Sequence, residues 1–349
     1  MSKISVIIPT YNAEKTLDTC LYSLNNQTYR DFNVIAVNDG STDKSLDVLA
    51  RLQAQLGIDI TIYDKTNGGA ASARKYALDR TDSKYVTFLD SDDYVDKRYL
   101  EEMHDVIEET DTNICSARFT IHFNNPILRH IPFKCKKREK SVDLVKDKKY
   151  LALLNVVTTA KLYRREYVDI TKRDFKANED LSYNYFLYAQ ARHISFANNA
   201  GYHYIPNSTG LVSTKISGYT WDRMQNTFLP LSHLKRVFED HELLDTYYSE
   251  IEQIFINNIF QRVDYIFKAV TNEEDRINLI NTLFDFLTLH FPNWRDNKYL
   301  KEDFKGFEIP FIMSAKANKK RILTYTPTIY GSEEEVIKQY KNISERIRS

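Results

Sequence analysis

Short apolar runs alternate with amphipathic stretches through the first 120 residues of the chain. The apolar runs are each long enough for one buried strand, and they cover residues 4–8, 32–37, 58–63, 85–89 and 114–119. The amphipathic stretches carry apolar side chains at helical spacing, and they cover residues 14–26, 43–56, 70–80 and 97–109. Regular alternation of this kind predicts an α/β fold on a mixed, mainly parallel sheet.

The pattern changes after about residue 215. Residues 243–270 have apolar side chains at helical spacing over most of their length. The sequence from Thr271 to Glu274 fits a capping box and predicts a second helix, which ends near residue 291. Ser332, with Glu335 three residues later, predicts a third helix. We therefore expect residues 1–215 to form one α/β domain and residues 216–349 a smaller, mainly helical C-terminal region.

Composition limits the partners of the chain. Its 349 residues are 42% hydrophobic, enough for a large core, and 48 basic residues balance 48 acidic ones, which gives no sign of nucleic-acid binding. Three distant cysteines, Cys20, Cys115 and Cys135, make neither a disulfide framework nor a zinc site. We see no signal peptide and no apolar run long enough to span a bilayer. The sequence thus predicts a cytoplasmic protein, either soluble or peripheral at the inner membrane face.

One irregular stretch is strongly basic. It contains Lys134, Lys136, Lys137, Arg138 and Lys140. Such a cluster is either a solvated loop or a contact for anionic lipid headgroups or a phosphate-bearing partner.

Polar side chains collect where the predicted parallel strands end. The sequence reads Pro9-Thr10-Tyr11 after the first strand, Asn38-Asp39-Gly40-Ser41 after the second, Asp64-Lys65 after the third and Asp90-Ser91-Asp92-Asp93 after the fourth. In α/β sheets, ligands bind beyond the carboxyl ends of the strands. These residue types also make ordinary turns, which would explain any one of the loops by itself. Their recurrence at successive strand ends favours a ligand site.

The spacing of Asp90 and Asp92 brings two carboxylates near one another at a strand end. Paired carboxylate oxygens suit a hard divalent cation, Mg²⁺ or Mn²⁺, and leave coordination places for phosphate oxygens. The alternative interpretation is a helix cap or a plain turn before residues 97–109. Asp39 has no evident local structural task, because Asp43 can cap the following helix. An acceptor at such a strand end can read the imide N–H of a uracil.

A third loop, from Asn67 to Arg74, places two glycines before a predicted helix. Gly68 and Gly69 permit close approach to the backbone, and Arg74 could point at a diphosphate. The spacing is that of neither a P-loop nor a dinucleotide-binding fingerprint.

These motifs resemble those of the family 2 inverting glycosyltransferases, which have the GT-A fold and include enzymes of bacterial polysaccharide and teichoic-acid synthesis. The resemblance covers about the first 110 residues, and it rests on the order and spacing of five motifs. They are residues 5–12, Gln27-Thr28-Tyr29, residues 38–43, Asn67-Gly68-Gly69 with Arg74, and residues 88–93. Later stretches, residues 161–164 and Asn178-Glu179-Asp180, look like acceptor-side motifs of the same family.

The resemblance assigns roles to matching positions. It implies that Pro9 and Tyr11 flank the nucleobase, that Asp39 binds uracil and that Arg74 lies near the diphosphate. It implies further that Asp90 and Ser91 contact the donor, that Asp90 and Asp92 bind the metal, and that Asp180 is the catalytic base. The chain departs from many relatives in having Asn38 where they have Asp. Some relatives add a histidine ligand to the metal, for which His203 is a candidate, although a histidine flanked by tyrosines is more often packed in the core.

The function that this resemblance implies is transfer of a hexosyl or N-acetylhexosaminyl group from a UDP-sugar to a hydroxyl acceptor, with inversion. The acceptor would be a glycan, a lipid-linked glycan or a polymer of the cell envelope. The helical C-terminal region would then be a packed subdomain, an oligomer interface or an acceptor platform. Two rivals remain at this stage: a sugar-1-phosphate nucleotidyltransferase, although the loop after residue 8 lacks its glycines, and a non-catalytic nucleotide-sugar or glycan-binding protein.

Overall fold

The computed structural model describes residues 3–122, 130–133, 140–168, 180–206, 227–301 and 331–348. Cys135 and most of the basic stretch, from Lys134 to Lys137 with Arg138, lie outside these residues. The chain divides into two compact units. The N-terminal unit comprises Met1–Asp147 and Asn155–Ser213, and the helical unit comprises Lys148–Leu154 and Thr214–Ser349. The assignment of the short segment at 148–154 to the helical unit was not predicted.

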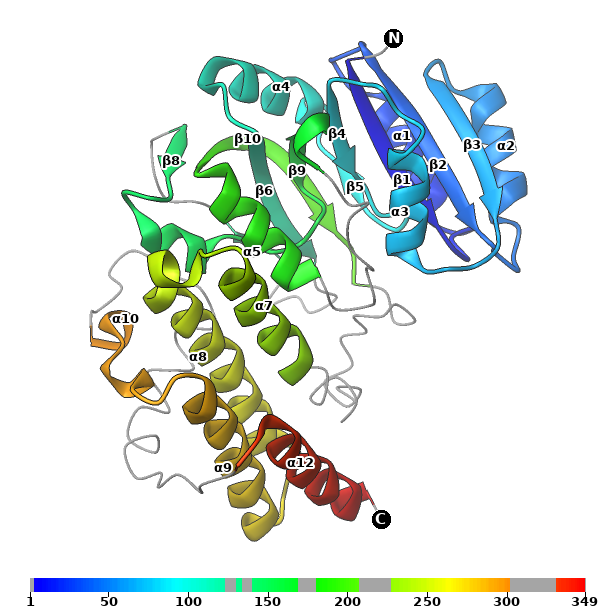
Figure 1. Ribbon diagram of the computed structural model, residues 1–349. Helices are drawn as coiled ribbons and strands as arrows, with labels where there is room; N and C mark the ends of the chain where they lie inside the picture. Colours follow the sequence, from blue (N-terminus) through cyan, green and yellow to red (C-terminus); the bar gives the residue numbers. More distant parts are fainter. Residues whose placement is uncertain are drawn as a thin grey trace. The chain divides into compact units, whose positions relative to one another are not determined.

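Four parallel strands form one half of the sheet in the N-terminal unit (Figure 1). They are β1 (Ile4–Thr10), β2 (Phe32–Asp39), β3 (Asp59–Lys65) and β4 (Tyr85–Phe88). The helices that follow them in the chain are α1 (Leu17–Asn25), α2 (Ser45–Gln55), α3 (Ala70–Leu78) and α4 (Tyr99–Thr110). β1 is buried along its whole length, as expected for a central parallel strand covered on both faces. Each of these elements lies within a few residues of its predicted position.

The other half of the sheet is mixed. Its strands are β5 (Tyr94–Val95), β6 (Ile114–His122), β7 (His130–Phe133), β8 (Ser141–Asp143), β9 (Lys161–Arg164) and β10 (His193–Tyr204). The strand order in the described residues is β3-β2-β1-β4-β9-β6-β10-β5, with β7 beside β6 and β8 beside β10. β9 runs antiparallel between β4 and β6, whereas β6 and β10 are parallel. The short helices η2 (Arg165–Tyr167) and α5 (Asp180–Ala191) complete the unit.

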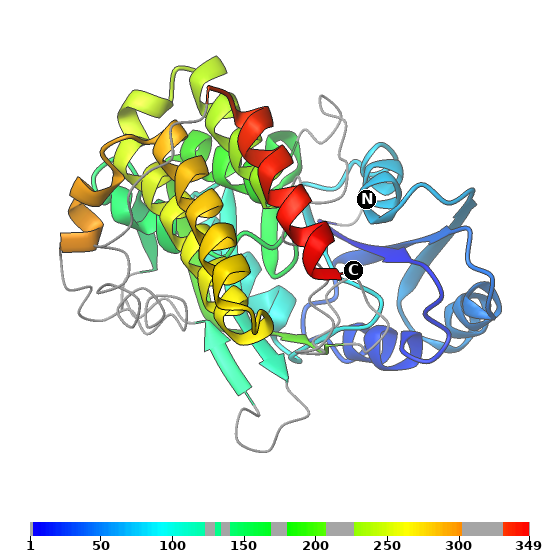
Figure 2. The same ribbon diagram turned by 90° about the horizontal axis from the view of Figure 1, so that it is seen from below.

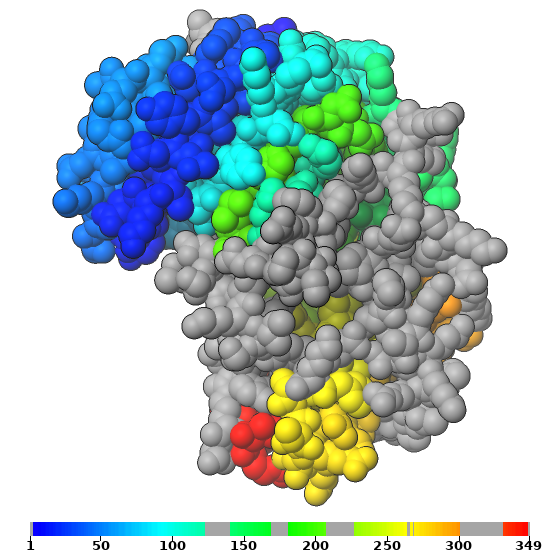
Figure 3. All heavy atoms as spheres, turned by 180° about the vertical axis from the view of Figure 1, so that it is seen from behind, coloured from blue at the N-terminus to red at the C-terminus, as the bar shows by residue number. Residues whose placement is uncertain are grey.

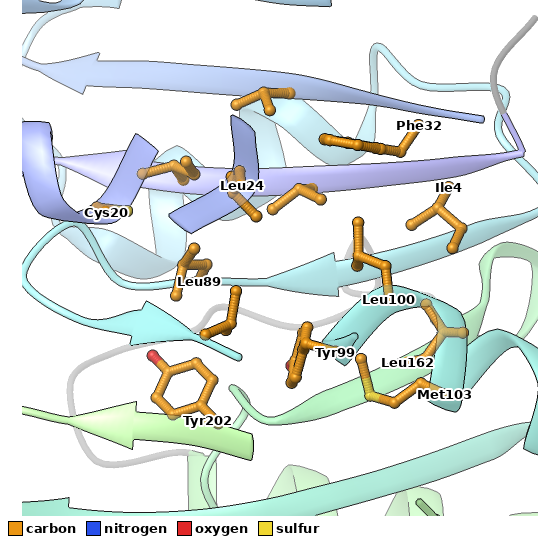
Figure 4. Close-up of a cluster of buried hydrophobic side chains, with 14 of the residues drawn as sticks. Ile4, Cys20, Leu24, Phe32, Leu89, Tyr99, Leu100, Met103, Leu162 and Tyr202 are labelled. Atoms are coloured by element: carbon orange, nitrogen blue, oxygen red, sulfur yellow. The ribbon is translucent and has the colours of Figure 1, made fainter. Parts of the chain in front are cut away.

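An apolar core joins the two halves of this sheet to α1 and α4 (Figure 4). Leu24 on α1 and Leu100 and Met103 on α4 are buried with Ile4 of β1 and Tyr202 of β10. The buried positions of α1 are those predicted from helical spacing, Leu17, Cys20, Leu21 and Leu24. Burial of this stripe fixes α1 against the sheet and leaves its opposite face exposed.

The helical unit consists, in its described part, of η1 (Lys148–Leu153), α7 (Phe228–Asp240), α8 (Leu244–Ala269), α9 (Glu273–His290), η4 (Trp294–Asp296), α10 (Lys298–Lys301) and α12 (Glu333–Arg348). Figure 2 shows α8, α9 and α12 side by side. Asn272 caps α9 by accepting a hydrogen bond of 2.9 Å from the backbone of Asp275. Aromatic side chains fill the core, for example Phe284 stacked on Trp294. Within the described residues, no helix combines the length and the apolarity needed to span a membrane.

Candidate functional site

The loops after β1 and β2 are hydrogen-bonded to each other. Asn12, at a φ of 48°, accepts from the backbone of Thr42 at 2.8 Å, and its own backbone donates to Ser41 Oγ at 3.0 Å. Pro9 is buried in β1, whereas Tyr11 is 52% exposed immediately beyond it. The structure therefore puts an exposed aromatic ring on a fixed loop at the carboxyl end of the sheet.

Asp39, the last residue of β2, holds the glycine loop in place. Its carboxylate pairs with Lys65 Nζ at 2.5 Å and accepts from the backbone of Gly68 at 3.0 Å and of Gly69 at 2.7 Å. The side chain is only 2% exposed. The expectation that Asp39 has no local structural task is thus wrong, because this carboxylate ties the ends of β2 and β3 to the start of α3.

The same loop depends on Gly40. Its φ of 68° lies in the left-handed region, and a Cβ there would approach the backbone nitrogen of Asn67 to 2.8 Å. The close approach lets the Asn67 side chain donate to the Asp39 carbonyl at 2.9 Å. Glycine at position 40 therefore allows the loop after β2 to pack closely against the loop before α3.

Arg74 and Asp90 meet at this edge of the sheet. Arg74 lies one turn into α3, and its Nη2 contacts Asp90 Oδ1 at 2.7 Å. The arginine side chain is 11% exposed and the aspartate side chain 34% exposed, so this pair lies at the boundary between core and solvent. The sequence predicted both residues for the site, and the structure brings them into direct contact.

Asp92 differs from its neighbours in the motif. In the part of the chain that the structure describes, its carboxylate has a hydrogen bond with its own backbone and no ion pair with another residue. Burial, and then the nearby charge of Asp90, raise the pKa of Asp92 to about 6. Burial and the neighbouring negative charge thus destabilise the ionised form of Asp92. A bound cation would stabilise that form. Ser91, between the two acids, is buried.

Asp93 points the other way, into the core. Its Oδ2 accepts from the Tyr202 hydroxyl at 2.5 Å and its Oδ1 accepts from the backbone of Ile205 at 2.9 Å. Tyr202 also accepts from the backbone of Asp90 at 3.3 Å. Burial, followed by the charges of Asp90 and Asp92, raises the pKa of Asp93 to about 9. This residue anchors the acidic loop to the end of β10.

A cysteine lies beneath the acidic loop. Cys20 of α1 is fully buried, and its sulfur is 3.7 Å from the carbonyl oxygen of Asp90. Burial, and then the charge of Asp93, raise the pKa of this thiol well above its usual range. The neutral thiol is therefore a packing group under the site.

No group of three or more His, Cys, Asp or Glu side chains converges as a ready-made metal site in the part of the chain that the structure describes. Asp90 turns towards Arg74 and Asp93 towards Tyr202, which leaves Asp92 as the carboxylate with open coordination. Sites for Mg²⁺ in nucleotide-dependent enzymes commonly use one or two carboxylates with substrate phosphates. Asp92, with Asp90, fits such a cation.

His203 is held by other side chains. Its Nε2 lies 2.9 Å from Asp96 Oδ1 and its Nδ1 lies 2.7 Å from His122 Nε2, while its ring stacks on Tyr94 with centroids 4.5 Å apart. Both ring nitrogens thus have partners within the N-terminal unit, which favours the packed interpretation of this histidine over a metal ligand.

Asp180 begins α5, but its side chain lies outside the described residues, so its predicted role as base stays a prediction. The sequence interpretation missed three residues that organise the site: Lys65, Tyr202 and the core-facing Asp93. Lys65 and Asp93 both occur in motifs at strand ends, and this position was the signal that could have identified them as site residues. Nothing near Tyr202 in the sequence indicates its contact 109 residues away.

The fold and the acidic strand end define the class of the N-terminal unit, which is a GT-A-type α/β domain. Residues 5–170 match the family model "Glycosyl transferase family 2". The match confirms the resemblance of this part of the chain to the family 2 glycosyltransferases.

Relatives with longer chains extend the similarity. The chain is 28% identical over 217 residues to poly(ribitol-phosphate) beta-N-acetylglucosaminyltransferase TarS of Staphylococcus aureus, covering 60% of this chain and 36% of that protein. It is 25% identical over 364 residues to poly(ribitol-phosphate) beta-glucosyltransferase of Bacillus spizizenii, covering 98% of this chain and 52% of that protein. The chain thus spans about half or less of the length of these relatives.

Among solved structures, the chain is similar to the crystal structure of S. aureus TarS 1–349 in complex with UDP-GlcNAc. The TM-score is 0.66 at 20% sequence identity, over 99% of this chain and 91% of that one. At this identity the similarity confirms the fold, including a helical region after the α/β domain.

Proposed function

We propose that the chain is a metal-dependent inverting glycosyltransferase, with residues 1–215 as its catalytic domain, that moves a sugar from a UDP-sugar to a hydroxyl of a cell-envelope polymer. The observation that carries the proposal is the arrangement of Arg74, Asp90 and Asp92 at the carboxyl edge of a GT-A sheet. A cationic side chain paired with one carboxylate, with a second carboxylate two residues further along the chain, suits a diphosphate leaving group together with its cation.

In this proposal each side chain has a stated task. Tyr11 covers the nucleobase and Asp39 accepts from the imide N–H of uracil. Asp39 exchanges one of its four present contacts with Lys65, Gly68 and Gly69 for this one. Arg74 exchanges part of its contact with Asp90 for the diphosphate. A divalent cation, Mg²⁺ or Mn²⁺, held by Asp92 and Asp90, would supply further positive charge for the departing UDP.

Transfer then needs one displacement. The acceptor oxygen bonds to the anomeric carbon while the bond from that carbon to the diphosphate oxygen breaks, and UDP leaves with the electron pair. Asp180, at the start of α5, takes the acceptor proton as general base. Because nucleophile and leaving group occupy opposite faces of the sugar, the anomeric configuration inverts.

The names of the two curated relatives support a poly(ribitol-phosphate) acceptor and leave the sugar open, since one transfers N-acetylglucosamine and the other glucose. We therefore propose a polyol-phosphate chain as acceptor and a hexose or N-acetylhexosamine as the sugar.

The test is a donor screen. UDP-GlcNAc and UDP-glucose are incubated with the protein and ribitol-phosphate oligomers, with Mn²⁺, with Mg²⁺ or with EDTA, and both transfer and hydrolysis are followed. We expect transfer from one UDP-sugar that EDTA abolishes, and UDP as a better competitor than GDP. Nucleotide binding without any turnover would instead indicate a non-catalytic binder, and formation of UDP-sugar from UTP and a sugar phosphate would indicate a nucleotidyltransferase.

A further inference from the structure

A groove of about 630 Å³ lies between α1 and the strand β5, away from the contacts of the donor site described above. This volume is within the range of about 300–1,000 Å³ that is usual for ligand sites. In Figure 3 the dark blue and cyan segments, which include α1 and the chain after β5, adjoin on the surface of the N-terminal unit. Its lining includes Tyr22, Ser23, Arg30, Tyr94, Asp96 and Lys97.

One wall of the groove is the face of α1 that the core does not use. Tyr22 and Ser23 lie three and four residues after Thr19, and Asn26 at the end of the helix follows three residues after Ser23, so these residues form one stripe. The opposite stripe is buried in the core. Tyr22 is 45% exposed, so its ring is open to contact with a ligand.

The other wall is fixed from behind. The Tyr94 ring stacks on His203 at an interplanar angle of 8°, and Asp96 is held by His203 and by Arg118 at 3.0 Å. The two walls are also joined, because the backbone of Val95 donates to Ser23 Oγ at 3.3 Å and Gln27 donates to the carbonyl of Asp96 at 2.8 Å. The groove is therefore pre-formed, which lowers the entropy that a ligand loses on binding.

The rim of the groove carries two positively charged side chains. Arg30 and Lys97 both line it and are exposed, and neither forms an ion pair with any carboxylate in the described part of the chain. Asp96, the one acidic residue of the lining, is already paired with Arg118. Two uncompensated cations beside tyrosine, serine and asparagine side chains suit an anion that also carries hydroxyl groups.

One lining residue of the groove, Tyr94, lies close to the metal-binding carboxylates. Tyr94 follows Asp92 by two residues, so their Cα atoms are at most about 7 Å apart. A flexible chain bound in the groove can thus place a hydroxyl group near the transfer site.

We propose that the groove between α1 and β5 binds the acceptor chain, as a polyanionic polyol phosphate, a few repeating units away from the hydroxyl group that receives the sugar. The cations pair with successive phosphates, and Tyr22 packs against the carbon chain of the polyol. This inference rests on the proposed function for its choice of ligand.

The experiment compares a long and a short acceptor. The wild type, a Tyr22→Ala/Lys97→Ala variant and a control Tyr248→Ala/Lys341→Ala variant are assayed with a ribitol-phosphate polymer and with a single ribitol phosphate. Tyr248 is 41% exposed and Lys341 is exposed, and both belong to the helical unit, so the control removes the same side chains elsewhere. We expect the groove variant to raise KM for the polymer by about tenfold or more, with kcat, donor hydrolysis and turnover of the short acceptor unchanged. An unchanged polymer KM in the groove variant would overturn the proposal.

A direct binding measurement separates this inference from the proposed function. Calorimetry titrates the ribitol-phosphate polymer, and neutral dextran as a comparison, into the three proteins at low and moderate salt. Polymer binding by the wild type and the control, lost in the groove variant, supports the groove even where no transfer to ribitol phosphate occurs. Absence of polymer binding by the wild type, or equal binding by all three proteins, would overturn the proposal. Binding of neutral dextran as tightly as the polymer would also overturn it, because charge would then not select the ligand.

Discussion

The Tyr202 hydroxyl donates a hydrogen bond of 2.5 Å to Asp93 Oδ2, across 109 residues of sequence. Tyr202 belongs to β10 and Asp93 to the acidic loop after β4, and the backbone of Ile205 donates to the other carboxylate oxygen at 2.9 Å. The loop that presents Asp90 and Asp92 is thus anchored through the acid that faces the core. Positions that anchor a site in this way affect stability and ligand binding together.

The first prediction concerns the pH dependence of stability through Asp93. Its pKa is raised to about 9, chiefly by burial, whereas in the unfolded chain it is near 4. Between these values the folded protein keeps a proton that the unfolded chain has released. This contribution to the free energy of unfolding is therefore complete below pH 4 and is lost as pH rises through 9, with a slope of at most about 1.4 kcal/mol per pH unit. Denaturation in EDTA at several pH values should show Asp93→Asn to be less sensitive to alkali than the wild type. Parallel curves for the two proteins would contradict the assignment.

The second prediction concerns the cation. Because burial and Asp90 raise the pKa of Asp92 to about 6, the ionised form that a cation needs is scarce at pH 5 and predominant at pH 7.5. UDP with Mn²⁺ should therefore raise the melting temperature more at pH 7.5 than at pH 5, and EDTA should remove most of the gain. Asp92→Asn should lose the metal-dependent part. Asp105→Asn, at an exposed position of α4, is the matched control and should behave as the wild type.

The third prediction concerns Arg74. Removing a guanidinium that contacts a diphosphate costs about 1.5–3 kcal/mol of charge-assisted hydrogen bonding. Arg74→Ala should thus weaken UDP binding by roughly ten- to a hundredfold in calorimetry with Mn²⁺. Arg51→Ala, which breaks an exposed ion pair with Asp18, should leave UDP affinity unchanged. Equal affinities for all three proteins would exclude Arg74 from the donor site.

The fourth prediction concerns Gly40. Alanine there has to adopt a φ of 68° and meets the backbone of Asn67, so Gly40→Ala should lower the free energy of unfolding by about 1–3 kcal/mol. It should also weaken UDP binding, since the close contact of Gly40 with Asn67 determines the position of the loop beside Asp39. Gly57→Ala is the control, because its Cβ would meet nothing within 4 Å. Similar losses in the two variants would show that the effect is not local to the loop.

The fifth prediction concerns Asp180. Asn at this position keeps the size of the side chain and removes its basicity. Donor affinity should survive in Asp180→Asn, while transfer falls by roughly a hundred- to ten-thousand-fold, the usual value of a general base. Glu179→Gln, the neighbouring acid, tests whether the loss is specific. Transfer by Asp180→Asn at close to the wild-type rate would mean that this acid only favours the start of α5.

The elements of the first half of the sheet could be predicted because local pattern determines them. Leu17, Cys20, Leu21 and Leu24 are buried as their spacing indicated, and the strand ends carry the residues that the site uses. The antiparallel insertion of β9 between β4 and β6 could not be predicted, since it depends on pairing between distant segments.

The same limit applies within the site. The contact of Arg74 with Asp90 joins residues 16 apart on consecutive elements, and both were candidates. The pairing of Asp39 with Lys65 depends on the register of β2 and β3, which no local pattern fixes. A side chain that looked free for a ligand in the sequence therefore proved to be engaged in the fold.

The segment Lys148–Leu153 lies in the chain between parts of the α/β unit but is assigned to the helical unit, where Lys148 Nζ donates to the carbonyl of Thr246 at 2.8 Å. Tyr150 and Leu151 of this segment are buried. The helical unit is therefore made of two pieces of sequence, so no single cut of the gene yields both units whole. A fragment that stops near residue 213 keeps η1 without α8, and one that starts near residue 214 lacks η1. Expression of either half alone would leave apolar surface uncovered, and exchange of the C-terminal region between relatives would need a second junction on each side of η1.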